Sequence, residues 1–322
     1  MISRMNISRR SFLCSALAAA ALPKRLFAAE PADFDERLAM FLSDVHVSGL
    51  DASPDGKPLR LHTRDWLKRS VAEILKMAPL PRHVFVFGDL AYLQGRVEDY
   101  RRSAPELKLL VDAGIKLTIG MGNHDHRKAF LEVWPEYEKR TVAPGCVQTV
   151  TTLPDYDLIM LDSLSDSHKP GGGNPVGGGL TAAAKEWIVT QLPTWPRPFI
   201  LGAHHTAGEL KISKSQKLRE AINAFPNCRG YVHGHDHVWK TSLLNWRDRR
   251  GLPILTLPSN GFWGDIGYVK FKTGERKGQK VAIAQLVQKD FFLGPPVPPE
   301  QRLPAWDARL DDNRNHRCTF VL

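Results

Sequence analysis

The chain has 322 residues, 43% of them hydrophobic and 24% charged, and this composition predicts a folded, soluble protein. Its formal net charge is +10, but five basic and no acidic residues lie in the first 29, so the rest carries +5. Because this excess is spread along the chain, it forms no basic stripe of the kind that binds nucleic acid.

The first predicted element is an export signal. Residues 8–13 read Ser-Arg-Arg-Ser-Phe-Leu and open an apolar stretch at 12–22, a pattern that resembles a twin-arginine signal. Such a stretch covers only about half of a roughly 30 Å hydrocarbon layer, so we expect no stable membrane span. We expect a signal peptide at residues 1–29, one domain at 30–322, and a periplasmic or secreted mature protein. The cleavage position stays open, and an amphipathic start of a cytosolic protein is the alternative.

Short apolar runs with helical patterns between them predict an α/β fold. The predicted buried strands cover residues 38–43, 84–88, 116–120, 158–161 and 199–202. The patterns at 63–77 and 181–192 predict helices. Further strands at 253–257, 267–272 and 281–287, with a polar turn at 273–280, are expected to complete a second sheet. The Pro-rich tail from residue 294 is expected to cover the surface without regular structure.

Polar side chains follow these strands at their carboxyl ends, where ligands bind in open α/β sheets. They are Asp44, Asp89, Asn123, Asp162 and His204, and a further run at 230–233 leads to His235 and His237. Asp44 and His46 stand at positions i and i+2, as do His235 and His237, so each pair points to one side of an extended segment. We therefore expect a metal site at this edge.

The order of these residues is more specific than any one pair. The chain carries, in this order, Asp44-x-His46, Gly88-Asp89, Gly122-Asn123-His124-Asp125, Ala203-His204 and Gly234-His235-x-His237. This series resembles the signature of calcineurin-like metallophosphoesterases. The resemblance implies a four-layer αββα sandwich of two mixed β-sheets flanked by helices, and a metal-dependent hydrolase of phosphomonoesters or phosphodiesters.

The resemblance also implies a ligand set for two divalent ions. One ion would be held by Asp44, His46, Asp89 and His237, and the other by Asp89, Asn123, His204 and His235. Asp89 would bridge the ions, because two cations about 3.5–4 Å apart need a shared anionic ligand. A hydroxide between them would be the nucleophile. Oxygen and nitrogen donors without thiolate suit manganese, zinc, iron(II) or a mixture.

His124 and Asp125 resemble the general-acid pair of the family. An imidazolium held by a carboxylate can protonate a leaving alkoxide near neutral pH. The presence of His124 favours catalysis over the alternative of a non-catalytic metal-binding scaffold. We expect a small soluble phosphoester as substrate, with a nuclease of the same fold as a further alternative, and the oligomeric state stays open.

Tyr92 raises a question about the metal. The run Gly88-Asp89-Leu90-Ala91-Tyr92 resembles the second motif of purple acid phosphatases, in which the tyrosine binds ferric iron. In the general family, the position of His46 takes the place of that tyrosine. We therefore interpret His46 as the ligand and Tyr92 as a packed neighbour.

The remaining polar residues give weaker signals. We expect His205 not to be a ligand, while His126 and His233 either touch the site or are simply exposed. No role is assigned to His62, His83, His168 and His316. The glycine-rich run at 171–179 lacks a P-loop lysine, so it is expected to be a flexible loop or a mobile rim of the site. The cysteines after residue 29 could form one disulfide or remain three buried thiols.

Overall fold

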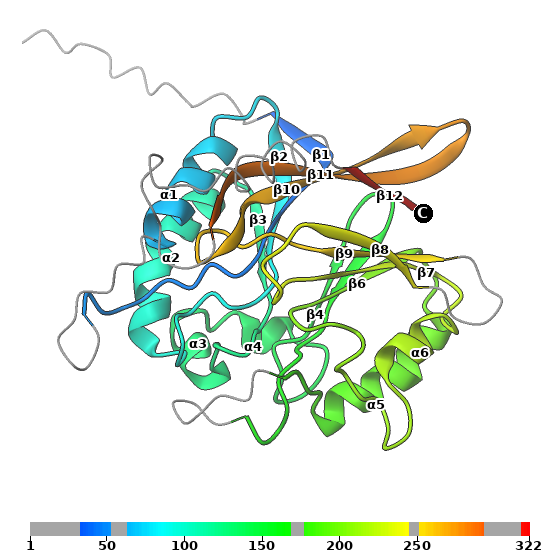
Figure 1. Ribbon diagram of the computed structural model, residues 1–322. Helices are drawn as coiled ribbons and strands as arrows, with labels where there is room; N and C mark the ends of the chain where they lie inside the picture. The colour runs from blue at the N-terminus through cyan, green and yellow to red at the C-terminus, as the bar shows by residue number, and fades with distance from the viewer. Residues whose placement is uncertain (1–32, 53–62, 169–176, 245–250, 293–316) are drawn as a thin grey trace, which may run out of the picture. The chain divides into compact units, whose positions relative to one another are not determined.

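Two six-stranded β-sheets lie face to face, and helices cover the outer side of each (Figure 1). The computed structural model describes residues 33–52, 63–168, 177–244, 251–292 and 317–322, all in one unit that runs from Ala32 to Leu322. The expected signal peptide, most of the glycine-rich loop, His62 and His316 lie outside the described residues.

The first sheet has the strand order β12-β11-β10-β1-β2-β3. Its strands are β1 (Phe34–Leu42), β2 (Leu80–Val86), β3 (Lys116–Ile119), β10 (Gly264–Arg276), β11 (Gln279–Phe292) and β12 (Arg317–Val321). β1, β2 and β3 run parallel, whereas β10 pairs antiparallel with β1, and β11 and β12 continue the antiparallel half.

The second sheet has the order β4-β5-β6-β7-β9-β8. Its strands are β4 (Thr149–Thr152), β5 (Asp157–Met160), β6 (Phe199–Ala203), β7 (Cys228–His233), β8 (Lys240–Leu244) and β9 (Leu252–Thr256). β5, β6, β7 and β9 run parallel, and β4 and β8 pair antiparallel at the two edges. Both sheets are mixed, as expected.

Alternation along the strands divides the core into three apolar layers. In β1, Met40 and Leu42 face the helices, whereas Ala39 and Phe41 face the second sheet, because successive side chains of a strand point to opposite faces. The layer between the sheets also holds Phe85 of β2 and Ile200 of β6. Three apolar layers separate four layers of backbone, which confirms the αββα sandwich.

The helices pack on the outer faces. The first sheet is covered by α1 (Thr63–Ile74), α2 (Val97–Asp112), α3 (Arg127–Val133) and α4 (Tyr137–Arg140). The second sheet is covered by α5 (Ala182–Gln191), followed by the 3-10 turn η1 (Leu192–Thr194), and by α6 (Leu218–Ile222). Among the described residues, the structure contains no helix with the length and apolarity to cross a bilayer.

Two expectations for the C-terminal part were wrong. β10 and β11 were expected to complete the second sheet but extend the first, where Leu38 pairs with Lys272. Their turn is only Lys277 and Gly278, both at positive φ, and the polar residues around it continue the two strands as a hairpin. In the tail, residues 294–316 lie outside the described residues, but Arg317–Val321 forms β12, which pairs with β11 and buries Cys318 and Phe320 in the layer between the sheets. Of the cysteines, Cys146, Cys228 and Cys318 are buried free thiols.

Candidate metal centre

The carboxyl ends of parallel strands from both sheets deliver the seven predicted ligands to one place. Asp44 and His46 follow β1, Asp89 follows β2, and Asn123 follows β3. The second sheet supplies His204 after β6, and His235 and His237 after β7. All of them except the partly exposed His235 are buried. We call these seven residues the ligand cluster.

The first half of the ligand cluster surrounds Asp44 and His46. Oδ1 of Asp44 lies 3.0 Å from Nε2 of His237, and the Nε2 atoms of His46 and His237 face each other at 3.4 Å. Oδ2 of Asp89 is 3.7 Å from Nε2 of His46. Carboxylate oxygens and imidazole nitrogens that converge in this way are the donors that a divalent cation takes.

The second half surrounds His204. Its Nε2 lies 3.1 Å from Oδ2 of Asp89, 3.1 Å from Oδ1 of Asn123 and 3.2 Å from Nδ1 of His235. Oδ2 of Asp89 therefore stands between the two halves, in the position expected of a carboxylate shared by two ions.

Hydrogen bonds outside the ligand cluster fix how its members point. Nδ1 of His204 donates to the carbonyl oxygen of Phe87 at 2.9 Å, which turns Nε2 inward. Ser43 donates to Oδ2 of Asp44 at 2.5 Å, and the His124 amide donates to Oδ1 of Asp89 at 2.8 Å. The His235 amide also donates to both oxygens of Asp44, so the protein fixes the orientation of each carboxylate, and Oδ1 of Asp44 and Oδ2 of Asp89 face the histidines.

The backbone of the ligand cluster is strained. Asp44, His46, Asp89, His235 and His237 all have φ between 49° and 71°, a region that residues other than glycine rarely adopt. The strain persists because neighbouring backbone holds it, as in the 2.9 Å bond from the His46 amide to the Asp89 carbonyl. Next to them, a Cβ on Gly122 would overlap Oδ1 of Asp89, so only glycine allows the backbone to pass this close to the carboxylate.

Electrostatics favour positive charge at this place. Burial raises the pKa of Asp89, but His204 and His46 outweigh burial and hold the pKa well below its usual range. Burial lowers the pKa of His46 to about 3, so this imidazole is neutral. The pKa of His204 rises to about 10 in spite of burial, because Asp89 and Asp44 attract a proton to it. Two ionised carboxylates that draw a proton onto a buried imidazole would accept a divalent cation instead, so the residues fit the metal.

His124 and Asp125 do not form the side-chain pair that was expected. The Asp125 carboxylate accepts from the amides of Gly122 at 2.9 Å and Ala91 at 3.0 Å and from the Tyr100 hydroxyl at 3.0 Å. His124 instead donates from Nδ1 to the carbonyl oxygen of Leu93 at 2.9 Å, and its ring centroid lies 5.1 Å from that of His46. Asp125 is therefore a buried anchor for backbone, and a carbonyl orients His124.

Asp162 was also expected at the site, but the structure places it in a buried ion pair. Its carboxylate binds Arg127 through two bonds, Nε to Oδ2 at 2.6 Å and Nη2 to Oδ1 at 2.9 Å. Because both oxygens are engaged, Asp162 ties β5 to the start of α3 and does not join the ligand cluster.

The flanking histidines differ in position. His205 lies against His204 and His235, with Nδ1 hydrogen-bonded to Ser163 at 2.8 Å and Nε2 buried without a partner among the residues that the structure describes. His233 is buried and bonded to Thr256 at 3.1 Å, while His126 is partly exposed.

Two aromatic residues beside the ligand cluster were missed. The Phe262 ring centroid lies 4.2 Å from that of His46, and the Trp263 centroid lies 4.4 Å from that of His237. Tyr92 packs against Phe262 at 5.8 Å, as a neighbour of the site. The available signal was the turn sequence Ser259-Asn260-Gly261, which begins three residues after the end of β9, and the carboxyl end of β9 lies at the same edge.

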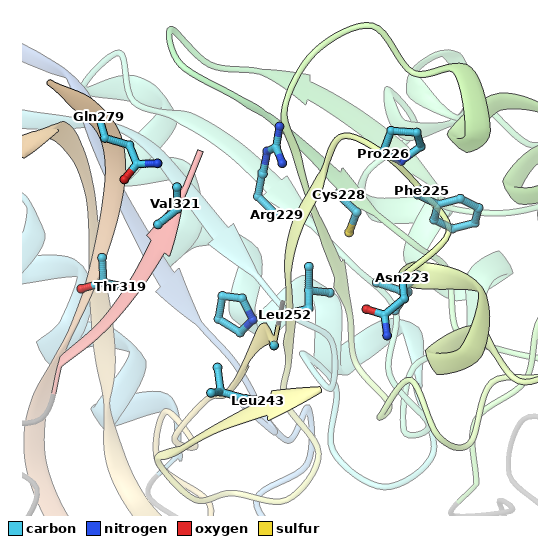
Figure 2. A pocket seen from close by; sticks show the side chains of 13 residues that line it. Asn223, Phe225, Pro226, Cys228, Arg229, Leu243, Leu252, Gln279, Thr319 and Val321 are labelled. Atoms are coloured by element: carbon cyan, nitrogen blue, oxygen red, sulfur yellow. The ribbon is translucent and has the colours of Figure 1, made fainter. Parts of the chain in front are cut away.

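A separate cavity of about 680 Å³ contains no residue of the ligand cluster (Figure 2). Its lining includes Asn223, Cys228, Arg229, Leu252 and Val321. It lies around the amino-terminal start of β7 and β9, so it is not part of the metal centre.

The chain resembles known proteins in sequence and in structure. Residues 39–239 match the family model of calcineurin-like phosphoesterases. A Rhodopseudomonas palustris protein named probable cyclic nucleotide phosphodiesterase is 26% identical over 262 residues, which cover 79% of this chain and 84% of that protein. Similar solved structures include TT1561 of Thermus thermophilus, with 14% identity, coverage of 72% and 93%, and a TM-score of 0.46. Another is the calcineurin-like phosphoesterase YfkN of Bacillus subtilis, with 12% identity, coverage of 78% and 88%, and a TM-score of 0.38.

Proposed function

Since the chain belongs to the calcineurin-like phosphoesterase family and is a hydrolase of ester bonds, we propose that it cleaves small soluble phosphoesters at a centre of two divalent metal ions. The observation that carries the proposal is the position of Asp89 Oδ2, which lies 3.1 Å from His204 and 3.7 Å from His46. One oxygen between two sets of donors is what a dinuclear centre requires.

In this proposal Asp44, His46, Asp89 and His237 hold one ion. Asp89, Asn123, His204 and His235 hold the other. Manganese, zinc, iron(II) or a mixture suits these donors. When bound, the ions supply a hydroxide nucleophile and neutralise the charge that develops on the phosphoryl group.

The residues around the ligand cluster hold the metal ligands in position and provide a proton. Hydrogen bonds donated by Ser43 and the His124 amide, and the one that the Phe87 carbonyl accepts from His204, keep the metal ligands in place before substrate arrives, so little reorganisation is needed. His124, partly exposed and oriented by Leu93, can protonate the leaving oxygen from Nε2.

Cyclic nucleotides and other phosphodiesters are the first substrates to test, because the R. palustris relative bears the name of a cyclic nucleotide phosphodiesterase. The deciding experiment is a hydrolysis screen of the protein reconstituted with manganese or zinc. It compares phosphomonoesters, cyclic nucleotides, glycerophosphodiesters and DNA. Turnover of a small phosphoester supports the proposal. Cleavage of DNA alone would identify a nuclease, and metal binding without any turnover would identify a scaffold.

We also propose that residues 1–29 direct export by the twin-arginine route, which the motif at residues 8–13 supports. Fusion of residues 1–35 to a reporter that is active only outside the cytoplasm tests this. Substitution of Arg9 and Arg10 by lysine should abolish export, and undiminished export of that variant would refute the proposal.

A further inference from the structure

Three aromatic side chains form a surface beside the ligand cluster that the proposed chemistry does not use. We call Tyr92, Phe262 and Trp263 the aromatic wall. Phe262 contacts both His46, at 4.2 Å between ring centroids, and Tyr92, at 5.8 Å. Trp263 lies on His237 at 4.4 Å. Phe262 and Trp263 therefore contact two of the proposed ligands directly.

Part of the aromatic wall is open to solvent. Trp263 is 37% exposed, and Tyr92 and Phe262 are partly exposed. Leu93, whose carbonyl holds His124, is 44% exposed on the segment that carries Tyr92. Apolar area left in water beside a reactive centre is typical of a surface that a ligand covers.

The turn that carries Phe262 and Trp263 is held rigidly against the ligand cluster. Ser259 donates to the carbonyl oxygen of Asp44 at 2.9 Å and accepts from the Phe262 amide at 2.9 Å. Gly264 follows with φ of 85°, and a Cβ there would overlap the carbonyl oxygen of His237. The turn that carries Phe262 and Trp263 is thus fixed against the backbone of Asp44 and His237 before any ligand binds.

From this geometry we propose that the aromatic wall, with Trp263 as its main contact, binds the nucleobase of a nucleotide substrate. The inference rests on the proposed function, which places the phosphate at the ligand cluster. One face of Trp263 lies on His237, and its exposed surface is a platform on which a planar, uncharged ring can stack. A quaternary ammonium group would also suit aromatic rings, and the test below distinguishes it from a base.

The test compares two phosphomonoesters that differ only in the base, adenosine 5′-monophosphate and ribose 5-phosphate. Glycerophosphocholine, a phosphodiester that carries a quaternary ammonium group and no base, is the third substrate. Base stacking on an aromatic side chain corresponds to about tenfold in affinity. Trp263→Ala should therefore raise the KM for the adenosine ester about tenfold, change kcat little, and leave the KM for ribose 5-phosphate unchanged. Trp263→Phe should retain most of the wild-type KM, and Val189→Ala, an exposed change on α5, should have no effect.

A structural role for Trp263 predicts a different result. If the ring only shields His237, its removal would lower metal content and raise the KM for all three substrates alike, which would overturn the inference. A loss confined to glycerophosphocholine would also overturn it.

Calorimetric titration of both ribose compounds into metal-loaded His124→Ala protein measures binding without depending on turnover. If the unsubstituted enzyme hydrolyses no phosphoester, the proposed function fails, and this titration still decides whether Trp263 binds the base. Equal affinities for the two compounds would refute the inference, whereas tighter binding of the adenosine compound that disappears in His124→Ala/Trp263→Ala would support it.

Discussion

Nδ1 of His124 donates a hydrogen bond to the carbonyl oxygen of Leu93 over 2.9 Å, so the second ring nitrogen remains available for substrate. A carbonyl oxygen fixes the tautomer of the ring. We predict that His124→Ala binds both metals but loses about 10² to 10⁴ in kcat on alkyl phosphoesters, whose leaving groups need a proton. Metal analysis and steady-state kinetics measure the two effects.

An activated aryl phosphoester provides the control, because its leaving group departs without help. The loss in His124→Ala should shrink on that substrate, whereas the neighbouring His126→Ala should behave like wild type on both. Equal losses on the two substrates would show that His124 positions phosphate and does not donate a proton.

Asp125→Asn should weaken the structure around the site. An amide cannot replace both carboxylate oxygens, since one of them accepts from Gly122 and the other from Ala91 and Tyr100. We expect the free energy of unfolding to fall by about 1–3 kcal/mol, measured in urea. Catalysis should fall by the same factor for activated and unactivated substrates. A loss restricted to poor leaving groups would return Asp125 to the role of partner of His124.

Asp89→Asn should affect both metal positions. The change removes the negative charge that two cations would share, so metal content should fall below two ions per chain and turnover should fall with it. Extended chelation of the wild type should abolish turnover, and added manganese should restore it. Full activity in protein shown to be free of metal would disprove the two-metal proposal.

Tyr92→Phe should leave metal content and turnover nearly unchanged. The Tyr92 ring packs against Phe262, and phenylalanine preserves that contact. A phenolate bound to iron(III) absorbs visible light, so the purified protein is expected to be colourless with manganese or zinc. A purple iron-loaded protein that loses its colour in Tyr92→Phe would identify Tyr92 as a ligand.

His83 should make stability depend on pH. Burial, with Arg140 and Lys116 nearby, lowers its pKa to about 3, whereas the unfolded chain has the ordinary value near 6.5. Above pH 6.5 neither state is protonated. Between pH 6.5 and 3 only the unfolded state binds the proton, so stability falls by about 1.4 kcal/mol per pH unit as the pH drops.

His83→Gln isolates this effect. Glutamine can keep a hydrogen bond to Thr118, which His83 makes at 2.9 Å, but it takes up no proton. Urea unfolding at pH 7.5 and pH 5 should show a decrease about 2 kcal/mol smaller in the variant. Equal decreases in both proteins would show that His83 titrates normally in the folded state.

The sequence predicted which side chains gather at this edge, because each follows a buried strand and the carboxyl ends of parallel strands meet. Their assignment as metal ligands came from the resemblance to calcineurin-like metallophosphoesterases and stays a prediction. The sequence could not show that Asp162 pairs with an arginine, or that Asp125 binds backbone amides and a tyrosine instead of His124. Their roles depend on Arg127 and Tyr100, which lie on helices whose packing the pattern does not give. An acid at a strand end is equally suited to bind a cation or an arginine.

The C-terminal strands show a second limit. Alternation in β10 and β11 predicts that one face is buried, but it does not say which sheet they join. The aromatic wall depends on the turn between β9 and β10, where no periodic pattern exists. Phe262 and Trp263 therefore became visible only when the fold brought that turn beside His46 and His237.

The placement of β1 between β2 and β10 has a consequence during protein synthesis. Leu38 pairs with Lys272, so the strand that leads to Asp44 lacks one neighbour until β10 has left the ribosome. Contacts between such distant residues form slowly. In the nascent chain, β1 is an unpaired sheet edge that can pair with strands of other chains. Any premature stop before β10 would leave that edge permanently open, so truncated products of this chain should aggregate.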